Sequence, residues 1–172
     1  MHEAGHAVAL LADPPHPWID FISIVGLRAG LLGLVQTEAR WQPHMATYSA
    51  SPETTNLWRQ LAHKDVTHYM AGPVAELRWR RLSRLGILIA GRQQRDHCLG
   101  DVTLEPGSDL DRVRARLLWA YPDDPHQAFS RVWDETEEFV TKHWRAIVLL
   151  GRTLRERGRI GGEELLSINL LG

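Results

Sequence analysis

The stretch that decides the fold is HEAGHAVALL at residues 2–11, because it joins a metal-binding pattern to an apolar helix. Residues four apart lie on one face of an α-helix, about 6 Å apart along its axis. His2 and His6 can therefore direct their imidazoles at one metal ion, in the HExxH pattern that zinc hydrolases use. The apolar residues that follow predict a buried helix. Buried histidines need a metal or hydrogen-bonding partners, and the pattern favours a metal.

Glu3 follows the first histidine directly, within reach of a water bound to the same ion. A hydrolytic zinc site combines three protein ligands with one open position for that water. Zinc lowers the pKa of the water to about 7, and a neighbouring carboxylate can take up its proton. We therefore predict that His2 and His6 are zinc ligands and that Glu3 is the catalytic base. The third ligand has to come from elsewhere in the chain.

The composition predicts a single soluble, cytoplasmic domain that spans residues 1–172. Its net charge of −1 gives no electrostatic case for binding nucleic acid or an anionic membrane. The single cysteine, Cys98, excludes an internal disulfide and fits a reducing compartment. No apolar run approaches the roughly 18 residues of a membrane helix, and no signal peptide precedes the first motif.

Residues 18–37 are rich in β-branched and apolar side chains, and they predict a β-hairpin with its turn near Gly30. An edge strand beside a zinc helix can hold an extended peptide by main-chain hydrogen bonds. A ribbon that only covers the helix fits the sequence equally well.

A long helix is predicted to begin at Ser51 and Pro52, which supply a capping side chain and a proline in the first turn. Its apolar stripe continues to Pro73. The segment AGPVAEL at residues 71–77 then offers small residues that permit close helix packing, with Glu76 among apolar neighbours. A buried carboxylate needs a partner, which is either a ligand histidine or a nearby arginine.

Other polar residues in this region are expected to be structural. His63 and His68 are five apart, which is a poor spacing for one helix face, so we interpret both as structural or solvent-facing. The arginines between residues 78 and 84 predict a solvated surface rather than a nucleic-acid interface.

Residues 85–106 show no clear periodicity. His97 and Cys98 in this region are possible zinc ligands by residue type, but nothing fixes their position relative to the first helix, so we expect the two to lie in a loop. The next helix is predicted to begin at residues 107–110. Asp109 and Asp111 suit the positive N-terminal end of that helix. The functional alternative is that Asp109 supplies the missing third ligand.

The C-terminal part is expected to be helical. From Pro125 the apolar pattern predicts one long amphipathic helix that ends near Gly158. A short helix over residues 160–168 is expected to dock on it.

The order and spacing of three motifs, HEAGHAVAL, AGPVAEL and GSDL, resemble the peptidase domain of FtsH-type ATP-dependent zinc proteases. The SIV and LLGLV segments are similar to that family's ribbon, and KHWRAIVLLGRTLRERGRIGGEEL is similar to its C-terminal helices. The resemblance implies a mainly α fold, a helical array with a small two-stranded β-ribbon. It also implies that His2, His6 and Asp109 bind zinc, that Glu3 is the base, and that the domains form hexameric rings.

The sequence departs from the family pattern in two respects. It contains no GxxxxGK[ST] loop and no membrane anchor, so the resemblance is to a standalone form without the ATPase. The usual small residues before the third ligand are replaced by Glu105, Pro106 and Gly107, which keeps Asp111 as the alternative to Asp109.

These observations predict a zinc-dependent endopeptidase that hydrolyses short or unfolded polypeptides. The expected partners are a polypeptide substrate and either further copies of the chain or a partner protein in trans, with no nucleic acid and no membrane. Two alternatives remain open. One is a non-catalytic zinc-binding or protein-interaction domain with the same fold, and the other is a zinc amidase for a small substrate.

Overall fold

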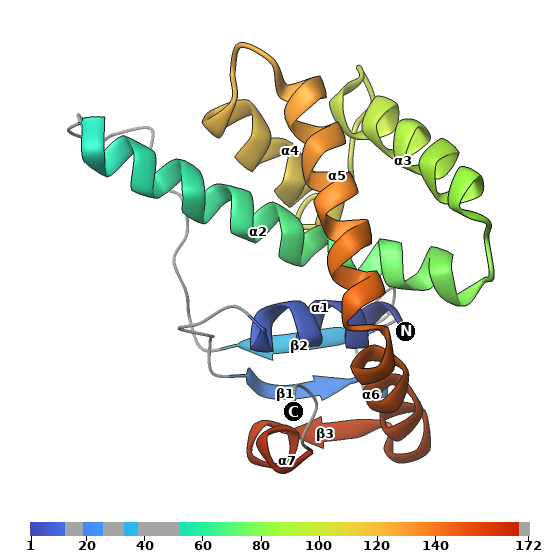
Figure 1. Ribbon diagram of the computed structural model, residues 1–172. Coiled ribbons are helices and arrows are strands. Elements are labelled where there is room, and N and C mark those ends of the chain that lie inside the picture. Colours follow the sequence, from blue (N-terminus) through green and yellow to red (C-terminus); the bar gives the residue numbers. More distant parts are fainter. Residues whose placement is uncertain (13–18, 26–32, 38–51, 169–172) are drawn as a thin grey trace.

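The computed structural model describes residues 1–12, 19–25, 33–37 and 52–168, and it confirms a mainly helical fold with a small antiparallel sheet (Figure 1). In chain order the elements are α1 (His2–Leu11), β1 (Ile19–Ser23), β2 (Leu34–Thr37), α2 (Pro52–Trp79), α3 (Arg84–Leu99), α4 (Asp109–Ala120), α5 (Pro125–Lys142), α6 (Trp144–Arg157), β3 (Arg159–Gly161) and α7 (Gly162–Ser167). In Figure 1, helices α2 to α5 lie above the sheet and α1 lies between the sheet and α2, while α6 lies beside the strands and α7 lies below them next to β3.

Within the described residues the sheet has three strands in the order β2-β1-β3, one more than the predicted two-stranded ribbon. The predicted hairpin pairing is present, with Ile22 opposite Val35, while the expected turn near Gly30 lies outside the described residues. Strand β3 pairs with the other side of β1 and places Ile160 opposite Ile22. It occupies the start of the predicted 160–168 helix, which is shortened to α7. Two strands separated by more than a hundred residues are thereby joined in one sheet.

Helix α2 begins at Pro52, as the proline in its first turn predicts, but it does not end at the Gly72–Pro73 pair. Proline removes one intrahelical hydrogen bond, and here the helix continues past it to Trp79. The AGPVAEL segment therefore forms the last part of α2, directly beside α1.

Helix α3 spans most of the region that lacks a clear period and includes His97 and Cys98, so the loop predicted for these two residues is wrong. The Ser83 hydroxyl caps the helix by accepting a hydrogen bond from the Gly86 N–H. Ser–X–X signals of this kind start helices even where the apolar pattern is weak.

The single helix predicted for residues 125–158 is also wrong, because His143 separates α5 from α6. The backbone of His143 leaves helical geometry, with φ −98° and ψ 15°. Asp124 caps the start of α5, and Gly158, at φ 74°, ends α6 where the sequence predicts an end. The break lets α5 pack on α2 and α3 while α6 packs on α1 (Figure 1).

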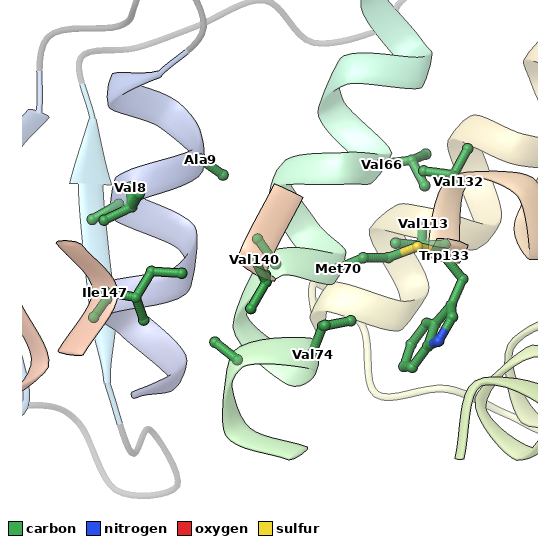
Figure 2. Close-up of a cluster of buried hydrophobic side chains, with 14 of the residues drawn as sticks. Val8, Ala9, Val66, Met70, Val74, Val113, Val132, Trp133, Val140 and Ile147 are labelled. Atoms are coloured by element: carbon green, nitrogen blue, oxygen red, sulfur yellow. The ribbon is translucent and has the colours of Figure 1, made fainter. Parts of the chain in front are cut away.

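The core fixes α1 from several sides. Val8 and the alanines of α1 are fully buried, and α1 packs against α2, α6 and both strands of the hairpin. Figure 2 shows Ile147 of α6 beside α1, and Val66, Met70 and Val74 of α2 facing α4 and α5. The helix that carries the HExxH motif is therefore held rigidly by the buried centre of the molecule.

Candidate metal centre

Three predicted ligands converge at the start of α1. The Nε2 atoms of His2 and His6 are 3.1 Å apart, and the Oδ2 atom of Asp109 lies 3.1 Å from the first and 3.2 Å from the second. Both histidines come from one face of α1, and Asp109 is the first residue of α4. Among the residues that the structure describes, these three form the group of histidine and carboxylate donors close enough to share one metal ion.

The outer nitrogens show how the imidazoles are oriented. Nδ1 of His6 donates to the carbonyl oxygen of His68 at 2.7 Å, and Nδ1 of His2 lies 3.4 Å from a carboxylate oxygen of Glu76. Metal-ligating histidines in proteins commonly use their second nitrogen in this way. In the neutral imidazoles, both Nε2 lone pairs then point toward the Asp109 oxygen.

Three lone pairs that face one another repel unless a cation lies among them, so the donor set itself calls for a proton or a metal. Zinc binds such nitrogen and oxygen ligands at about 2.0–2.2 Å, which corresponds to about 3.3 Å between two ligand atoms of a tetrahedron. The three measured separations are close to that value. The residues therefore fit a zinc ion with three protein ligands.

The electrostatics of the cluster agree with its geometry. Burial by itself raises the pKa of Asp109, but hydrogen bonds and charges from His2 and His6 outweigh it and hold that pKa well below its usual value. Burial by itself lowers the pKa of His6, but the Asp109 carboxylate, the His68 carbonyl and the charge of Glu3 together raise it. The ionised Asp109 carboxylate, together with Glu3 beside it, therefore attracts a cation to this site.

Glu3 lies beside the cluster and is not one of its ligands. Its carboxylate rests against the backbone of Gly33, where an added Cβ would come within 2.2 Å of Oε1. Burial raises the pKa of Glu3, while the nearby imidazoles partly oppose that shift. A carboxylate with a raised pKa can both accept and return a proton near neutral pH.

Close approach of two helices explains the small residues of AGPVAEL. An added Cβ on Gly5 would come 2.4 Å from the carbonyl oxygen of Ala71. An added Cβ on Gly72 would come 2.3 Å from Nε2 of His6, the nitrogen that faces the other ligands. The imidazole of His6 therefore occupies the space left by the missing side chain of Gly72.

Glu76 satisfies both predicted alternatives for its partner. One carboxylate oxygen lies near Nδ1 of His2, and the other accepts a hydrogen bond from the guanidinium of Arg80. The side chain therefore links the first ligand to a cation in the turn that follows α2, which restrains the orientation of His2.

The remaining sequence candidates lie outside the cluster. Asp111 accepts a hydrogen bond from the backbone N–H of Gly107, which is a helix-capping contact, so it is not a ligand here. His97 is exposed on α3, and the buried Cys98 thiol contacts the Leu110 carbonyl. His63 is structural as predicted, bonded to the Tyr121 hydroxyl and to Glu135.

Sequence reasoning missed two contributors to the site. His68 acts through its backbone carbonyl, which no side-chain pattern can reveal. Gly33 acts by having no side chain, and its only sequence signal is a glycine placed immediately before a strand.

No protein-family profile matches the chain, and no curated protein is similar enough in sequence to count as a match. None of the helices in the described part of the chain is both long enough and apolar enough to cross a lipid bilayer.

Proposed function

We propose that this chain is a zinc-dependent endopeptidase that cleaves short or unfolded polypeptides. The observation that carries the proposal is the convergence of His2, His6 and Asp109 on one point, with the Glu3 carboxylate beside them. The resemblance of the sequence motifs to FtsH-type peptidase domains agrees with the proposal and adds the expectation of ring assembly.

Each residue has a defined role in the proposed mechanism. His2, His6 and Asp109 hold the ion, which when bound supplies a water of lowered pKa and polarises the scissile carbonyl. Glu3 takes a proton from the attacking water and delivers it to the departing amine. The carbonyl of His68 and the carboxylate of Glu76 hold the two imidazoles in the orientation that ligation requires.

The surroundings of the cluster favour a polypeptide substrate over a small molecule. The side chains of His2 and Asp109 are 34% and 33% exposed, so the site opens to the surface. Strand β2 lies at the edge of the described sheet, and Gly33 immediately before it contacts Glu3. An extended peptide that pairs with β2 would pass next to the proposed base.

The test is cleavage of an unbiased library of unstructured peptides by the zinc-loaded protein. Glu3→Gln is expected to reduce the rate by about 10²–10⁴-fold while the protein retains zinc, because it removes only the proton acceptor. Glu163→Gln, which neutralises an exposed carboxylate on α7, is the matched control and should cleave normally. The proposal fails if the zinc-loaded wild type leaves the library uncut, or if Glu3→Gln cleaves as well as the wild type.

A non-catalytic zinc-binding or interaction domain is the second candidate function. The observation that favours it is a large groove at the end of α2, built from residues other than those of the metal cluster. In that case the protein binds zinc stoichiometrically, His2→Ala impairs folding or partner binding, and the wild type shows no hydrolysis.

A further inference from the structure

A groove of about 860 Å³ is lined by residues from the end of α2, the start of α3 and the junction of α5 with α6. Figure 1 shows where these helices lie. It is built from the last turn of α2 and its neighbours rather than from the metal ligands. The groove is lined by Arg78, Trp79, Arg81, Leu82, Arg84, Ile87, Glu137, Glu138, Thr141, Lys142 and Trp144.

The lining is positively charged, although the chain as a whole carries a net charge of −1. Three arginines and one lysine face two glutamates. Arg81, Arg84 and Lys142 form no ion pair with any residue that the structure describes. These cations are therefore available to a ligand of opposite charge.

The groove also presents aromatic and apolar surface. The guanidinium of Arg78 lies 5.1 Å from the ring centre of Trp144 and donates a hydrogen bond of 2.7 Å to Thr141, which fixes one wall. Trp79 and Leu82 are 46% and 41% exposed. Further along the chain, Leu85, Leu88 and Ile89 of α3 are also exposed. Exposed aromatic and leucine side chains that line a groove favour a ligand with apolar groups.

Arg81, whose charged side chain lines the groove, has a strained backbone conformation. Its φ is 60°, in the left-handed region that glycine usually occupies. The N–H of Leu82 donates to the Leu77 carbonyl and the N–H of Arg81 to the Arg78 carbonyl, which is the hydrogen-bond pattern of a helix ended by glycine. An arginine there costs about 1–2 kcal/mol.

We propose that this groove binds an acidic peptide segment with leucine or aromatic side chains, presented by a partner protein. Acidic groups of the peptide would pair with Arg81, Arg84 and Lys142, and its apolar groups would cover Trp79 and Leu82. A nucleic acid carries a phosphate at every nucleotide, so some phosphates would meet the two glutamates of the lining, whereas a peptide can place uncharged residues opposite these glutamates. Charge complementarity and the exposed apolar surface together select this occupant. The site does not depend on zinc or on the proposed hydrolysis.

The probe is a short fluorescein-labelled peptide in which aspartate and glutamate alternate with leucine and phenylalanine. Its binding is measured by fluorescence anisotropy with the full chain carrying Glu3→Gln, so that cleavage cannot obscure binding. We expect saturable binding that weakens as salt is added. A peptide with lysine in place of the acidic residues, and one with serine in place of the apolar residues, should both bind at least about tenfold more weakly.

The decisive variant is Arg81→Glu combined with Arg84→Glu, which should weaken the affinity by about tenfold or more through charge reversal at the rim. Arg155→Glu is the matched control, because Arg155 is exposed further along α6 and does not line the groove. It should bind the peptide as tightly as the parent. An unchanged zinc content and an unchanged thermal midpoint show that the double variant is folded. Trp79→Ser removes apolar groove surface without changing the charge, and it should also weaken peptide binding.

Three results would overturn the proposal. The first is equal affinity of the double variant and Arg155→Glu. The second is a single-stranded oligonucleotide that binds the groove more tightly than the peptide and displaces it. The third is sedimentation that shows a dimer lost in the double variant, with no peptide binding, which would assign the groove to a second copy of this chain.

Discussion

Around Gly72, helix α2 lies so close to α1 that the His6 imidazole fills the space that a side chain at residue 72 would need. In contrast, the end of α2 and the turn after it carry the large, exposed side chains of Trp79, Arg81 and Leu82. In the first region, the imidazole of His6 packs where the Cβ of another residue at position 72 would lie. In the second region, positively charged and apolar side chains are exposed at the groove. The comparison shows that the residues of the first region have no space for larger side chains, so substitutions there should affect metal binding and folding together. Changes in the second region should alter binding and leave the fold intact.

The largest effect is expected for Gly72→Ala. Its Cβ would come 2.3 Å from Nε2 of His6, and a rigid ring packed in the core cannot move away without losing its position in the cluster. We expect loss of stoichiometric zinc and a destabilisation of about 1–3 kcal/mol from overpacking. Zinc analysis and thermal unfolding measure both. Gly86→Ala, at a helical site with ordinary contacts, should keep full zinc, and full zinc in Gly72→Ala would show that the two helices are not so closely packed.

Gly33→Ala should separate catalysis from metal binding. The new Cβ would displace the flexible carboxylate of Glu3, while the three ligands stay in place. We expect the peptide cleavage rate to fall by about 10²-fold, since displacing a catalytic group by about 1 Å has that effect. Zinc content should be unchanged. Gly161→Ala, whose Cβ would meet no atom within 4 Å, is the control, and normal cleavage by Gly33→Ala would contradict the role given to Glu3.

Glu76→Gln tests whether the carboxylate between His2 and Arg80 restrains the first ligand. Loss of a carboxylate behind a metal-bound histidine typically weakens metal affinity by about 10–100-fold. Competition with a zinc-chelating dye measures the change. An unchanged zinc affinity would indicate that the backbone of α1 alone positions His2.

The pH dependence follows from opposite shifts in the pair of Asp109 and His6. The lowered pKa of Asp109 stabilises the native state at pH values above the usual 3.8, and this contribution is lost as pH falls through the native value. The raised pKa of His6 stabilises it below the usual 6.5, and this contribution is lost as pH rises through the native value.

For the zinc-free protein, the cluster should therefore stabilise the fold most between pH 3.8 and 6.5, while added zinc should raise the thermal midpoint more as pH increases above that window. Thermal scans in chelator and in zinc give both curves. Asp109→Asn is the control, because it removes the charge that both shifts share. A zinc effect that decreases from pH 6.5 to higher pH would contradict the assignment of His6 as a ligand.

The smallest effect is expected for Arg81→Gly at the exposed end of α2. Glycine relieves the left-handed strain, so we expect the protein to become more stable by about 1 kcal/mol while its affinity for the acidic peptide falls. Arg84→Gly is the matched control, because it removes the same charge at the first residue of α3, whose backbone has no left-handed strain to relieve. A loss of stability in Arg81→Gly would show that the Arg81 side chain makes a stabilising contact in the native state.

The sequence predicted those features that depend on residues close together in the chain, such as helix faces and helix starts. The HExxH spacing predicts that His2 and His6 share a face, and the Ser108–Asp109 helix start predicts a carboxylate at the beginning of α4. That Asp109 meets the histidines came from the family resemblance rather than from periodicity, because a contact across more than a hundred residues leaves no local pattern.

Three elements had signals too weak or too misleading to predict. Helix α3 exposes Leu85, Leu88 and Ile89 while it buries Ile87 and Cys98, so apolar residues occur all round it and obscure the period. The break at His143 interrupts the helix but not the helical spacing of its buried residues. The buried residues of α5 and those of α6 recur at the same three- or four-residue spacing, so the sequence predicts one continuous helix. Strand β3 has a single buried residue, Ile160, which is too little for an alternation.

The pairing of Ile22 with Ile160 has a consequence for the order in which the molecule is made. During synthesis, β1 leaves the ribosome long before β3, so the central strand lacks one of its two neighbours until β3 has been translated. Contacts between such distant residues form slowly, because the intervening chain loses much entropy when they close. The proposed metal centre has the same property: His2 and His6 cannot meet their third ligand until Asp109 has been translated, so under the proposed function a shorter nascent chain would have no peptide-cutting site.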